Sequence, residues 1–440
     1  MIRSRLAAGA ALIALSAGLW ACGNASDPKL NQTGPNPDLP AQNQSLVPPI
    51  KISPPAGWGD DKPVVPAGFA ITPFANDLKI PRQMLILPNG DVLVAEGRGD
   101  SAPRLRPKDV IAGMIKKKGN TQIEGGDRIT LLRDADNDGV PEVRTVLAQG
   151  LNAPYGLAYA DGFLYVAAQD AVLRLPFQPG QTGIAAPAQE LTKLPSRLNH
   201  HWTKAMALSG DGSKLYVGIG SNSNVGERGM AVEEERAVVW EIDRLTGARR
   251  TIATGIRNPT ALAIEPNTQL LWSVVNERDE LGPQLAPDYL TQVRDGAFYG
   301  WPYSYWGQNV DPRVRPQRPD LVAKTVKPDY ALGSHVAALG LDFARAGGFG
   351  GGFTQGAFIG MHGSWNRQDP SGYKVVWVPF QAGRPSGPPA DFVSGFLKDG
   401  KARGRPVGVA FDPAKRILLV ADDLSNTVWR VAPAAPQGTN

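Results

Sequence analysis

One pattern of apolar and polar positions recurs along most of the chain. A polar or proline-containing lead-in is followed by a short apolar run, a turn, a second apolar run and a polar loop. In residues 197–221, for example, alternating apolar residues stand on both sides of an Asp211-Gly212 turn. Such alternation around a tight turn is typical of a β-hairpin. The chain is therefore expected to consist mainly of short strands.

Six copies of this pattern predict the architecture. They begin at Ile80, Asn152, Asn199, Arg257, Ser334 and Arg403, and most are followed by a third apolar run. Since no copy can bury both of its own faces, the copies must pack against one another. We therefore expect an all-β fold, a six-bladed β-propeller with a central channel, over residues 66–433. Two stacked sandwiches would explain the strands, but not the polar residues that recur at the same two places in each copy.

The N-terminal residues have the features of an export signal. Arg3 and Arg5 precede an apolar run over residues 6–20, which is too short for a mature transmembrane helix. The run ends in Leu19-Trp20-Ala21-Cys22, which resembles a bacterial lipobox and implies removal of residues 1–21 and lipidation of Cys22. An ordinary signal peptide followed by an incidental cysteine is the alternative.

The expected location is outside the cytoplasm, on a membrane that faces the periplasm or at the cell surface. Cys22 is the only cysteine, so no disulfide forms within the chain and the expected role of this residue is that of an anchor. Gly23 stands where an acidic residue would favour the inner membrane, so we expect the outer membrane. No other apolar run is long enough to cross a membrane, and the lipid is the only predicted membrane contact.

Composition separates the remaining segments and argues against one class of partner. Residues 22–65 are rich in Pro, Asn and Gln and predict an extended tether, and residues 434–440 form a short tail. The net charge of +5 falls to +3 once residues 1–21 are removed, with 44 basic residues against 41 acidic ones. No long basic run is interleaved with aromatic residues, which argues against nucleic-acid binding.

Polar residues recur at two places in the copies. The innermost strand of each blade lines the channel of a propeller, so the residues just before it meet at one mouth, which the loops after the second strand also reach. The first set is Arg82, Tyr155, His201, Arg257 with Asn258, His335, and Arg403 with Arg405. The second set is Glu96, Arg98, Gln169, Asp170, Asn222, Asn224, Glu277, Asp279, His362, Asn366, Arg367, Asp422 and Asp423. Convergent polar groups in a concave site indicate a binding or active site.

Arginine and histidine are prominent at these positions, and their chemistry narrows the ligand. The planar fork of arginine binds carboxylates through two hydrogen bonds, while histidine accepts a proton near neutral pH. The combination suits a planar polyanionic ligand beside a group that loses a proton. His201 is then either a general base or a structural hydrogen-bonding residue, with His200 as its orienting neighbour. Each arginine taken alone could instead cap a loop.

Two acidic segments are candidate calcium sites. Asp134, Asp136 and Asp138 have the spacing of a calcium-binding loop, although Thr145 stands where a bidentate acid is expected. This segment either binds calcium or is a solvated turn. The second segment lies on the channel face and contains Asn276, Glu277 and Asp279. Its carboxylates either bind a metal ion or pair with the nearby arginines.

Several segments resemble one known family. They are NHHWTKAMALSGDGSKLYVGIGS from Asn199, GIRNPTALAIEP from Gly255, NERDELG from Asn276, FYGWP from Phe298, HGSWNR from His362 and RGRPVGVAF from Arg403. Jointly, and across residues 66–433, they resemble the glucose/sorbosone dehydrogenases, especially their bacterial lipoprotein and pyranose-dehydrogenase-like branch. The resemblance implies a six-bladed propeller that holds pyrroloquinoline quinone (PQQ) and Ca²⁺ and oxidises sugars.

The resemblance also implies roles for individual residues. His201 resembles the base that removes the hydroxyl proton while hydride moves to the quinone. Arg257 with Asn258 would lie beside the reacting quinone carbonyl, where positive charge stabilises developing negative charge. The expected cofactor-binding arginines are Arg82, Arg403 and Arg405.

Two features depart from the family pattern. Asn276-Glu277 stands where the soluble glucose enzymes have a Gly-Pro pair whose carbonyls bind calcium. The lysine that helps to hold the cofactor has no clear match, and His362 or Arg367 would take its place.

The resulting hypothesis is a PQQ- and Ca²⁺-dependent dehydrogenase that oxidises an aldose or related sugar and passes electrons to an acceptor outside the cytoplasm. Two other functions are the alternatives. A calcium-dependent lactonase or related propeller hydrolase would use channel-face carboxylates such as Glu277 and Asp279. A non-catalytic propeller would bind glycans or proteins. The sequence specifies neither the sugar and the acceptor nor the oligomeric state.

Overall fold

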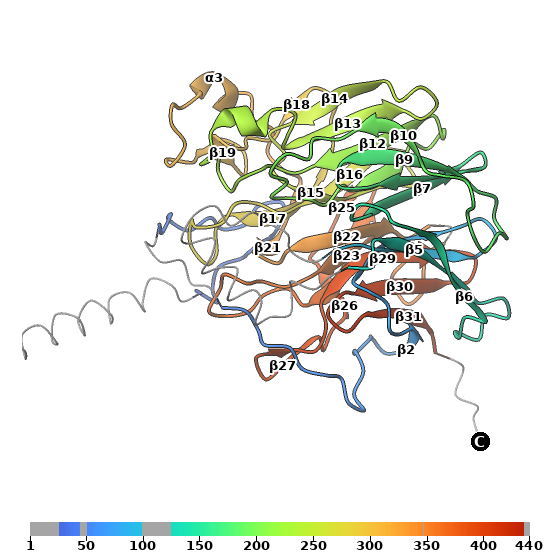
Figure 1. Ribbon diagram of the computed structural model, residues 1–440. Helices are drawn as coiled ribbons and strands as arrows, with labels where there is room; N and C mark the ends of the chain where they lie inside the picture. The colour runs from blue at the N-terminus through green and yellow to red at the C-terminus, as the bar shows by residue number, and fades with distance from the viewer. Residues whose placement is uncertain (1–25, 45–50, 99–124, 346, 435–440) are drawn as a thin grey trace, which may run out of the picture.

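The computed structural model describes residues 26–44, 51–98, 125–345 and 347–434. Its strands form six sheets of four or five strands, arranged as the blades of a β-propeller (Figure 1). This arrangement confirms the all-β, six-bladed prediction. Cys22 and residues 1–21 lie outside the described residues. None of the helices in the described ranges is long and apolar enough to cross a membrane.

The first three blades follow the chain without interruption. Blade one contains β3 (Pro81–Ile86), β4 (Val92–Glu96), β5 (Arg128–Arg133) and β6 (Val143–Gln149). Blade two contains β7 (Gly156–Ala160), β8 (Phe163–Ala167), β9 (Ala171–Pro176) and β10 (Gln189–Lys193). Blade three contains β11 (Met206–Leu208), β12 (Lys214–Ile219), β13 (Val238–Asp243) and β14 (Arg249–Thr254), with η1 (Met230–Glu233) before β13 and β18 (Ala297–Phe298) at its edge.

The last three blades carry insertions and an added edge strand. Blade four contains β15 (Pro259–Ile264), β16 (Leu271–Val275), β17 (Pro287–Gln292), β21 (Tyr330–Ser334) and β1 (Thr33–Gly34). Between β17 and β21 lie β18, β19 (Ser304–Tyr305), β20 (Asn309–Val310) and α3 (Pro319–Val322). Blade five contains β22 (Ala338–Phe343), β23 (Gly356–Met361), β24 (Lys374–Gln381), β25 (Arg384–Pro385) and β26 (Ala390–Val393). The hairpin of β27 (Leu397–Lys398) and β28 (Lys401–Ala402) leads to blade six, which contains β29 (Pro406–Asp412), β30 (Ile417–Asp422), β31 (Thr427–Pro433) and β2 (Phe69–Ala75).

The ring of blades closes through a strand from the other end of the chain. The inner strands β3, β7, β11, β15, β22 and β29 contact one another in this order, and β29 contacts β3 again. In blade six the outer strand is β2, which pairs antiparallel with β31. The N-terminal part of the propeller thus completes the last blade, so the two ends of the domain are held by backbone hydrogen bonds.

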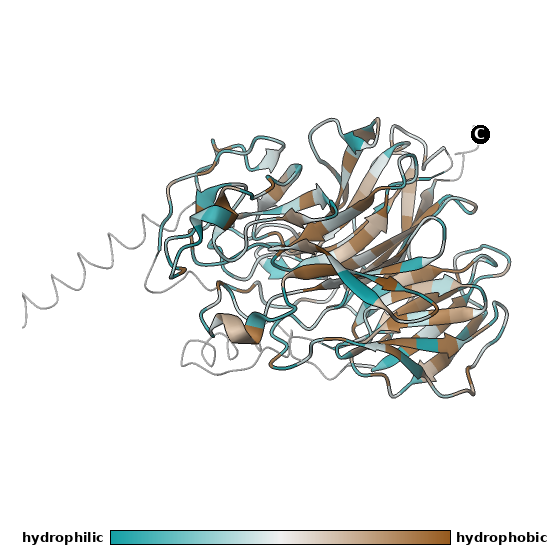
Figure 2. Ribbon diagram, turned by 90° about the horizontal axis from the view of Figure 1, so that it is seen from above, coloured by the Kyte–Doolittle hydropathy of each residue, from teal (hydrophilic) through white to brown (hydrophobic). Residues whose placement is uncertain are grey.

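The packing of β4 shows why almost every residue of many strands is apolar. All five residues of β4 are buried, because each face of the blade is covered by a neighbouring blade. Val92 and Val94 pack with residues of blade six, whereas Leu93 and Ala95 pack with residues of blade two. Figure 2 shows the same distribution for the whole molecule, with apolar residues in the strands and hydrophilic residues in many of the connecting loops.

The segment predicted as a tether is attached to the propeller wherever the structure describes it. Thr33 and Gly34 form β1 at the edge of blade four. Farther along the chain, Lys51 N donates to Trp365 O at 2.9 Å, and Val64 N donates to Ser394 O at 2.9 Å. These attachments are backbone hydrogen bonds, which do not depend on the side chains. They therefore produce no periodic pattern of apolar residues in the sequence. We call residues 26–65, as far as they are described, the N-terminal strap.

A tyrosine spans the central channel and divides it. Tyr155 lies just before β7 and is fully buried. Its hydroxyl accepts a hydrogen bond from Gln83 Nε2 at 3.1 Å and lies 3.1 Å from Thr260 O and 3.3 Å from Leu339 O, which are carried by three other blades. On one side of this bridge the inner strands line a mainly apolar cavity, and on the other side they open into a polar cavity. Of these two cavities, only the polar one is lined by residues from the two repeated positions.

Candidate functional site

The polar cavity collects most of the residues predicted from the repeated pattern. It has a volume of about 240 Å³ and lies at one end of the channel. All four histidines of the chain line it. The predicted site residues that it brings together are Arg82, His201, Arg257, Asn258, Asn276, Glu277, Asp279, His362 and Arg405.

Two predicted cofactor-binding arginines do not line this cavity. Arg403 forms an ion pair with Asp61 of the N-terminal strap. Arg367 is buried, but its guanidinium donates to Ser334 O at 3.1 Å and to Ser26 Oγ at 2.8 Å. In the structure both side chains fasten the strap to the propeller.

His201 has the geometry and the charge state of a base. Its Nδ1 lies 2.8 Å from Ser221 O, and because a carbonyl only accepts hydrogen bonds, Nδ1 must carry the proton. The neutral ring then keeps its lone pair on Nε2. Burial lowers the pKa of His201 well below its usual range, and the positive charge of Arg257 lowers it further. His200 packs edge-on against this imidazole, with the ring centres 4.7 Å apart.

Two basic side chains, Lys204 and Arg236, hold the backbone that carries His201. Leu198 and Asn199 have positive φ angles of 62° and 37°, so the chain turns sharply just before the histidines. Asn199 Oδ1 accepts hydrogen bonds from Lys204 Nζ and from Arg236 Nη1, each at 3.0 Å. Lys204 is fully buried, and burial lowers its pKa well below the usual range. The sequence pattern gave no signal for Arg236.

Arg257 is fixed mainly by backbone carbonyls. Its Nη1 donates to Asn276 O at 3.1 Å and to Glu277 O at 2.7 Å, while its Nε donates to Asn224 O at 3.1 Å. The guanidinium therefore stands at the wall of the cavity in one orientation. The neighbouring Asn258 is buried, and within the described ranges its Oδ1 has no hydrogen-bond donor.

The other two rim histidines face carboxylates. His335 Nδ1 lies 3.4 Å from Asp279 Oδ1, and its Nε2 lies 3.0 Å from Gly282 O. Burial lowers the pKa of His335, but Asp279 outweighs this effect and the net pKa is raised. His362 Nε2 lies 3.0 Å from Asp423 Oδ1. Here burial outweighs the carboxylate and the pKa of His362 is lowered.

Two arginines supply positive charge from the side of blades one and six. Arg82 forms an ion pair with Asp423 and lies over the ring of Trp202, 5.2 Å from its centre. Arg405 donates a long hydrogen bond of 3.5 Å to Ser53 O of the N-terminal strap. Both side chains are more than nine-tenths buried, and in the part of the chain that is described the Nε of each lacks an acceptor.

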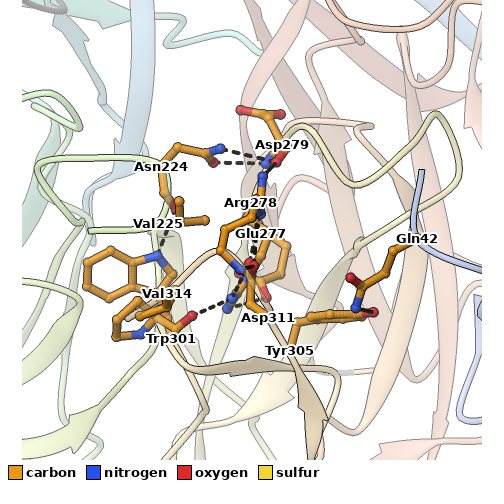
Figure 3. A network of polar contacts seen from close by, with 12 residues as sticks. Gln42, Asn224, Val225, Glu277, Arg278, Asp279, Trp301, Tyr305, Asp311 and Val314 are labelled. Atoms are coloured by element: carbon orange, nitrogen blue, oxygen red, sulfur yellow. Dashed lines mark hydrogen bonds and ion pairs between the residues drawn. The ribbon is translucent and has the colours of Figure 1, made fainter. Parts of the chain in front are cut away.

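The acidic wall contains a residue that the sequence pattern missed. Asp288, from β17, lines the cavity and accepts hydrogen bonds from Glu277 N at 2.7 Å and Ala337 N at 2.8 Å. Burial raises its pKa to about 7. Figure 3 shows the support behind Glu277, where the buried Arg278 pairs with Glu277 at 3.3 Å and with Asp311 at 3.1 Å. This network fixes the loop that carries the acidic wall.

The cavity is suited to a ligand that presents both a cation and carboxylates. Buried side-chain oxygens without a donor, counted over the described residues, include Asn258 Oδ1, Asn276 Oδ1, Glu277 Oε1 and Asn366 Oδ1. Since buried oxygens without donors are costly, they favour a bound cation. The Nε groups of Arg82 and Arg405 favour an anion in the same way. Arg257 donates to the Asn276 and Glu277 carbonyls, so the acceptors left without a donor on this wall are side-chain oxygens.

The acidic segment in blade one lies outside this cavity. Carboxylate oxygens of Asp134, Asp136 and Asp138 lie within 4.8 Å of one another, and Glu142 joins them. Thr145, which stands in the expected acidic position, instead lies in β6 and donates to Thr182 O at 2.8 Å. This cluster is therefore a second candidate metal site, separate from the polar cavity.

Comparison with curated proteins gives distant relatives. A protein of Borreliella burgdorferi described as uncharacterized is 27% identical over 299 residues, which cover 65% of this chain and 77% of that protein. The PQQ-dependent pyranose dehydrogenase of Coprinopsis cinerea is 24% identical over 358 residues, covering 71% of this chain and 44% of the dehydrogenase. The chain thus matches less than half the length of the pyranose dehydrogenase.

Solved structures with the same fold include two sugar dehydrogenases. The PQQ domain of the Coprinopsis cinerea pyranose dehydrogenase aligns with a TM-score of 0.68 at 20% identity, over 87% of this chain and 100% of that domain. The soluble aldose sugar dehydrogenase of Escherichia coli aligns with a TM-score of 0.57 at 16% identity, over 83% of this chain and 100% of that one. Likeness at such identities supports the fold.

A family model described as TrAA12-like matches residues 63–292 and 317–434, which is most of the chain. The six-bladed fold seen here agrees with that match. The chain belongs to the TrAA12-like family of PQQ-dependent propeller oxidoreductases.

Proposed function

We propose that this protein is a PQQ-dependent sugar dehydrogenase in which His201 is the general base. The observation that carries the proposal is the state of His201 in the polar cavity, where a neutral imidazole is anchored through Nδ1 to Ser221 O at 2.8 Å. A base must be unprotonated and fixed within reach of the proton that it removes. The names of the relatives, a pyranose dehydrogenase and an aldose sugar dehydrogenase, support a sugar as the substrate.

The residues of the chain would divide the work as follows. PQQ, when bound, supplies an acceptor for the hydride of the sugar carbon. Arg82 and Arg405 would bind its carboxylates and hold it in the cavity. Asn276 Oδ1 and Glu277 Oε1, which are buried acceptors, would bind Ca²⁺. His201 Nε2 would take the hydroxyl proton of the sugar, and Arg257 with Asn258 would stabilise negative charge nearby.

Reconstitution tests this function directly. The purified protein is freed of cofactor, loaded with PQQ and CaCl₂, and assayed with a redox dye and a panel of aldoses. We expect dye reduction that requires PQQ, calcium and a sugar together. A protein that binds no PQQ at micromolar concentration, or that hydrolyses lactones without PQQ, would exclude the proposal and favour a propeller hydrolase.

We also propose that the chain is exported and anchored to a membrane through a lipid on Cys22. The lipobox-like sequence motivates this proposal. The N-terminal strap is fastened near the cavity face, where Ser26 Oγ lies 2.8 Å from Arg367 Nη2, so a lipid on Cys22 would hold the enzyme close to the membrane. Mass spectrometry of the membrane fraction should find Cys22 acylated, and Cys22→Ser should release the protein. Recovery of unmodified Cys22 in the mature protein would contradict the anchor.

A further inference from the structure

The acidic cluster of blade one is independent of the cavity and unused by the proposed reaction. It lies in the turn between β5 and β6 and contains Asp134, Asp136, Asp138 and Glu142, one oxygen of each within 4.8 Å of the others. The proposal built on it rests on neither the PQQ site nor its metal. We call these four residues the turn cluster.

Hydrogen bonds of the turn occupy one oxygen of each carboxylate. Asp134 Oδ2 accepts from Gly139 N at 3.1 Å and Asp136 Oδ1 accepts from Asp138 N at 3.1 Å. Asp138 Oδ1 accepts from Val140 N at 2.7 Å, and Glu142 Oε2 accepts from Ala135 N at 2.9 Å. These bonds shape the turn, and none of them reaches Asp134 Oδ1. Across the described ranges, no lysine or arginine forms an ion pair with any of the four.

A buried oxygen of Asp134 points to the missing partner. Asp134 is only 3% exposed, and in the described structure its Oδ1 receives no hydrogen bond. Leaving an ionised carboxylate oxygen buried without a donor or a cation is unfavourable. The three carboxylates beside it add like-charge repulsion. A divalent cation would remove both costs at once, and a set of four carboxylates suits Ca²⁺ better than a transition metal.

The turn that carries the cluster also joins the first blade to the last. Lys415 Nζ, from the turn between β29 and β30, donates to Asp134 O at 2.7 Å. Arg430 Nη2, from β31, lies 3.2 Å from Asn137 Oδ1. Beneath these contacts, apolar residues of β4 and β30 pack into one cluster, with Val94 and Leu419 both fully buried. We call this contact between blades one and six the seam; here β2 of blade six leads directly into β3 of blade one, and the ring itself closes through the pairing of β2 with β31.

We propose that the turn cluster binds Ca²⁺ and that the ion fastens blade one to blade six. The ion would fix the turn whose backbone receives Lys415 and whose Asn137 receives Arg430. Its free energy of binding would then count toward the stability of the closed ring, because a ligand that binds only the folded state stabilises it. Glu142, rather than a residue at the position of Thr145, completes the carboxylate set.

The test uses the whole protein without PQQ and two kinds of variant. Asp136→Asn/Asp138→Asn and Glu142→Gln keep the acceptors for the N–H groups of the turn and remove negative charge. Glu190→Gln removes the same charge from an exposed outer strand and serves as the matched control. Melting temperature is measured in EGTA and in a few millimolar CaCl₂, and calcium binding is measured by calorimetry. Glu277→Gln, measured alongside, separates any calcium bound in the polar cavity.

We expect CaCl₂ to raise the melting temperature of the wild type, Glu190→Gln and Glu277→Gln by about 2–5 °C. The cluster variants should lose this gain together with one calorimetric site, and in EGTA they should melt no lower than the wild type, because their carboxylates repel less. A gain of equal size in the cluster variants would overturn the metal site.

Hydrogen exchange tests the seam, because calcium should protect β31 and the turn at Lys415 as well as residues 134–142. Protection confined to residues 134–142 would overturn the fastening of the blades.

Discussion

Both walls of the polar cavity carry histidines, but the histidines lie near side chains of opposite charge. On one wall His201 lies near Arg257, and both burial and this positive charge lower its pKa. On the other wall His335 and His362 each face a carboxylate, at 3.4 Å and 3.0 Å respectively. His201 and His335 precede the inner strands of blades three and five, whereas His362 follows the second strand of blade five. The two that occupy equivalent positions, His201 and His335, differ in their partners.

This difference is the basis for proposing His201, rather than the other two histidines, as the base. A carbonyl partner on Nδ1 leaves the second nitrogen of His201 as a lone pair in the cavity. His335 has both ring nitrogens engaged, Nδ1 with Asp279 and Nε2 with Gly282 O, and His362 has its Nε2 directed at Asp423. His362 and Arg82 both contact Asp423, which links the loops of blades five, six and one. Position on the rim thus brings a histidine to the cavity, and its hydrogen-bond partner decides what it can do there.

The largest expected effect is the difference in kcat between variants of the two kinds of histidine. His201→Asn should lower kcat by about 10³-fold, because positioned acid–base groups contribute on the order of 10²–10⁴-fold. It should still bind PQQ, as followed by the absorption of the bound cofactor. His362→Asn should lower kcat by less than about 10-fold and act mainly on PQQ affinity. Equal losses of kcat in both variants would show that the walls do not differ as described.

The next effect concerns two arginines that are neighbours in sequence but not in role. Arg405 lines the cavity, whereas Arg403 pairs with Asp61 of the N-terminal strap. Arg405→Ala should weaken PQQ binding by about 10–100-fold, which corresponds to the loss of a hydrogen bond to a charged group. Arg403→Ala should leave PQQ affinity within about twofold. Fluorescence titration with PQQ compares the two, and a larger loss in Arg403→Ala would reverse the assignment.

These two arginines also show how far the sequence reaches. The repeated pattern correctly predicted the propeller, because buried strands and turn residues are a local property of the chain. Loops of blades one, three, four, five and six that it singled out do line the cavity, but the predicted residues of blade two and those after the second strands of blades one and three do not. It could not separate Arg403 from Arg405, because both precede the same inner strand. In the structure Gly404 packs tightly between them, since an added Cβ there would lie 2.1 Å from Asp422 Oδ2.

Other parts of the site are formed by contacts that produce no recurring pattern in the sequence. Asp288 comes from the third strand of blade four, beside a register shift between Asp288 and Tyr289, and so falls in neither repeated position. Arg236 reaches the histidine segment through hydrogen bonds to Asn199 Oδ1 and to the backbone carbonyls of Arg197 and Gly220. The N-terminal strap is held partly by backbone hydrogen bonds, whose donors and acceptors every residue except proline has. Long-range contacts of these kinds become visible only once the chain is folded.

The smallest expected effect is the pH dependence of kcat/KM between pH 7 and pH 6. It distinguishes most directly between His201 and His335 as the base. The base must be neutral, so activity falls as the pH drops through its folded pKa. A histidine with an ordinary pKa of about 6.5 would lose about threefold over this interval. The pKa of His201 is lowered, so the wild type should lose less than about threefold. The pKa of His335 is raised, so a loss greater than about threefold would assign the base to that residue and to the opposite wall.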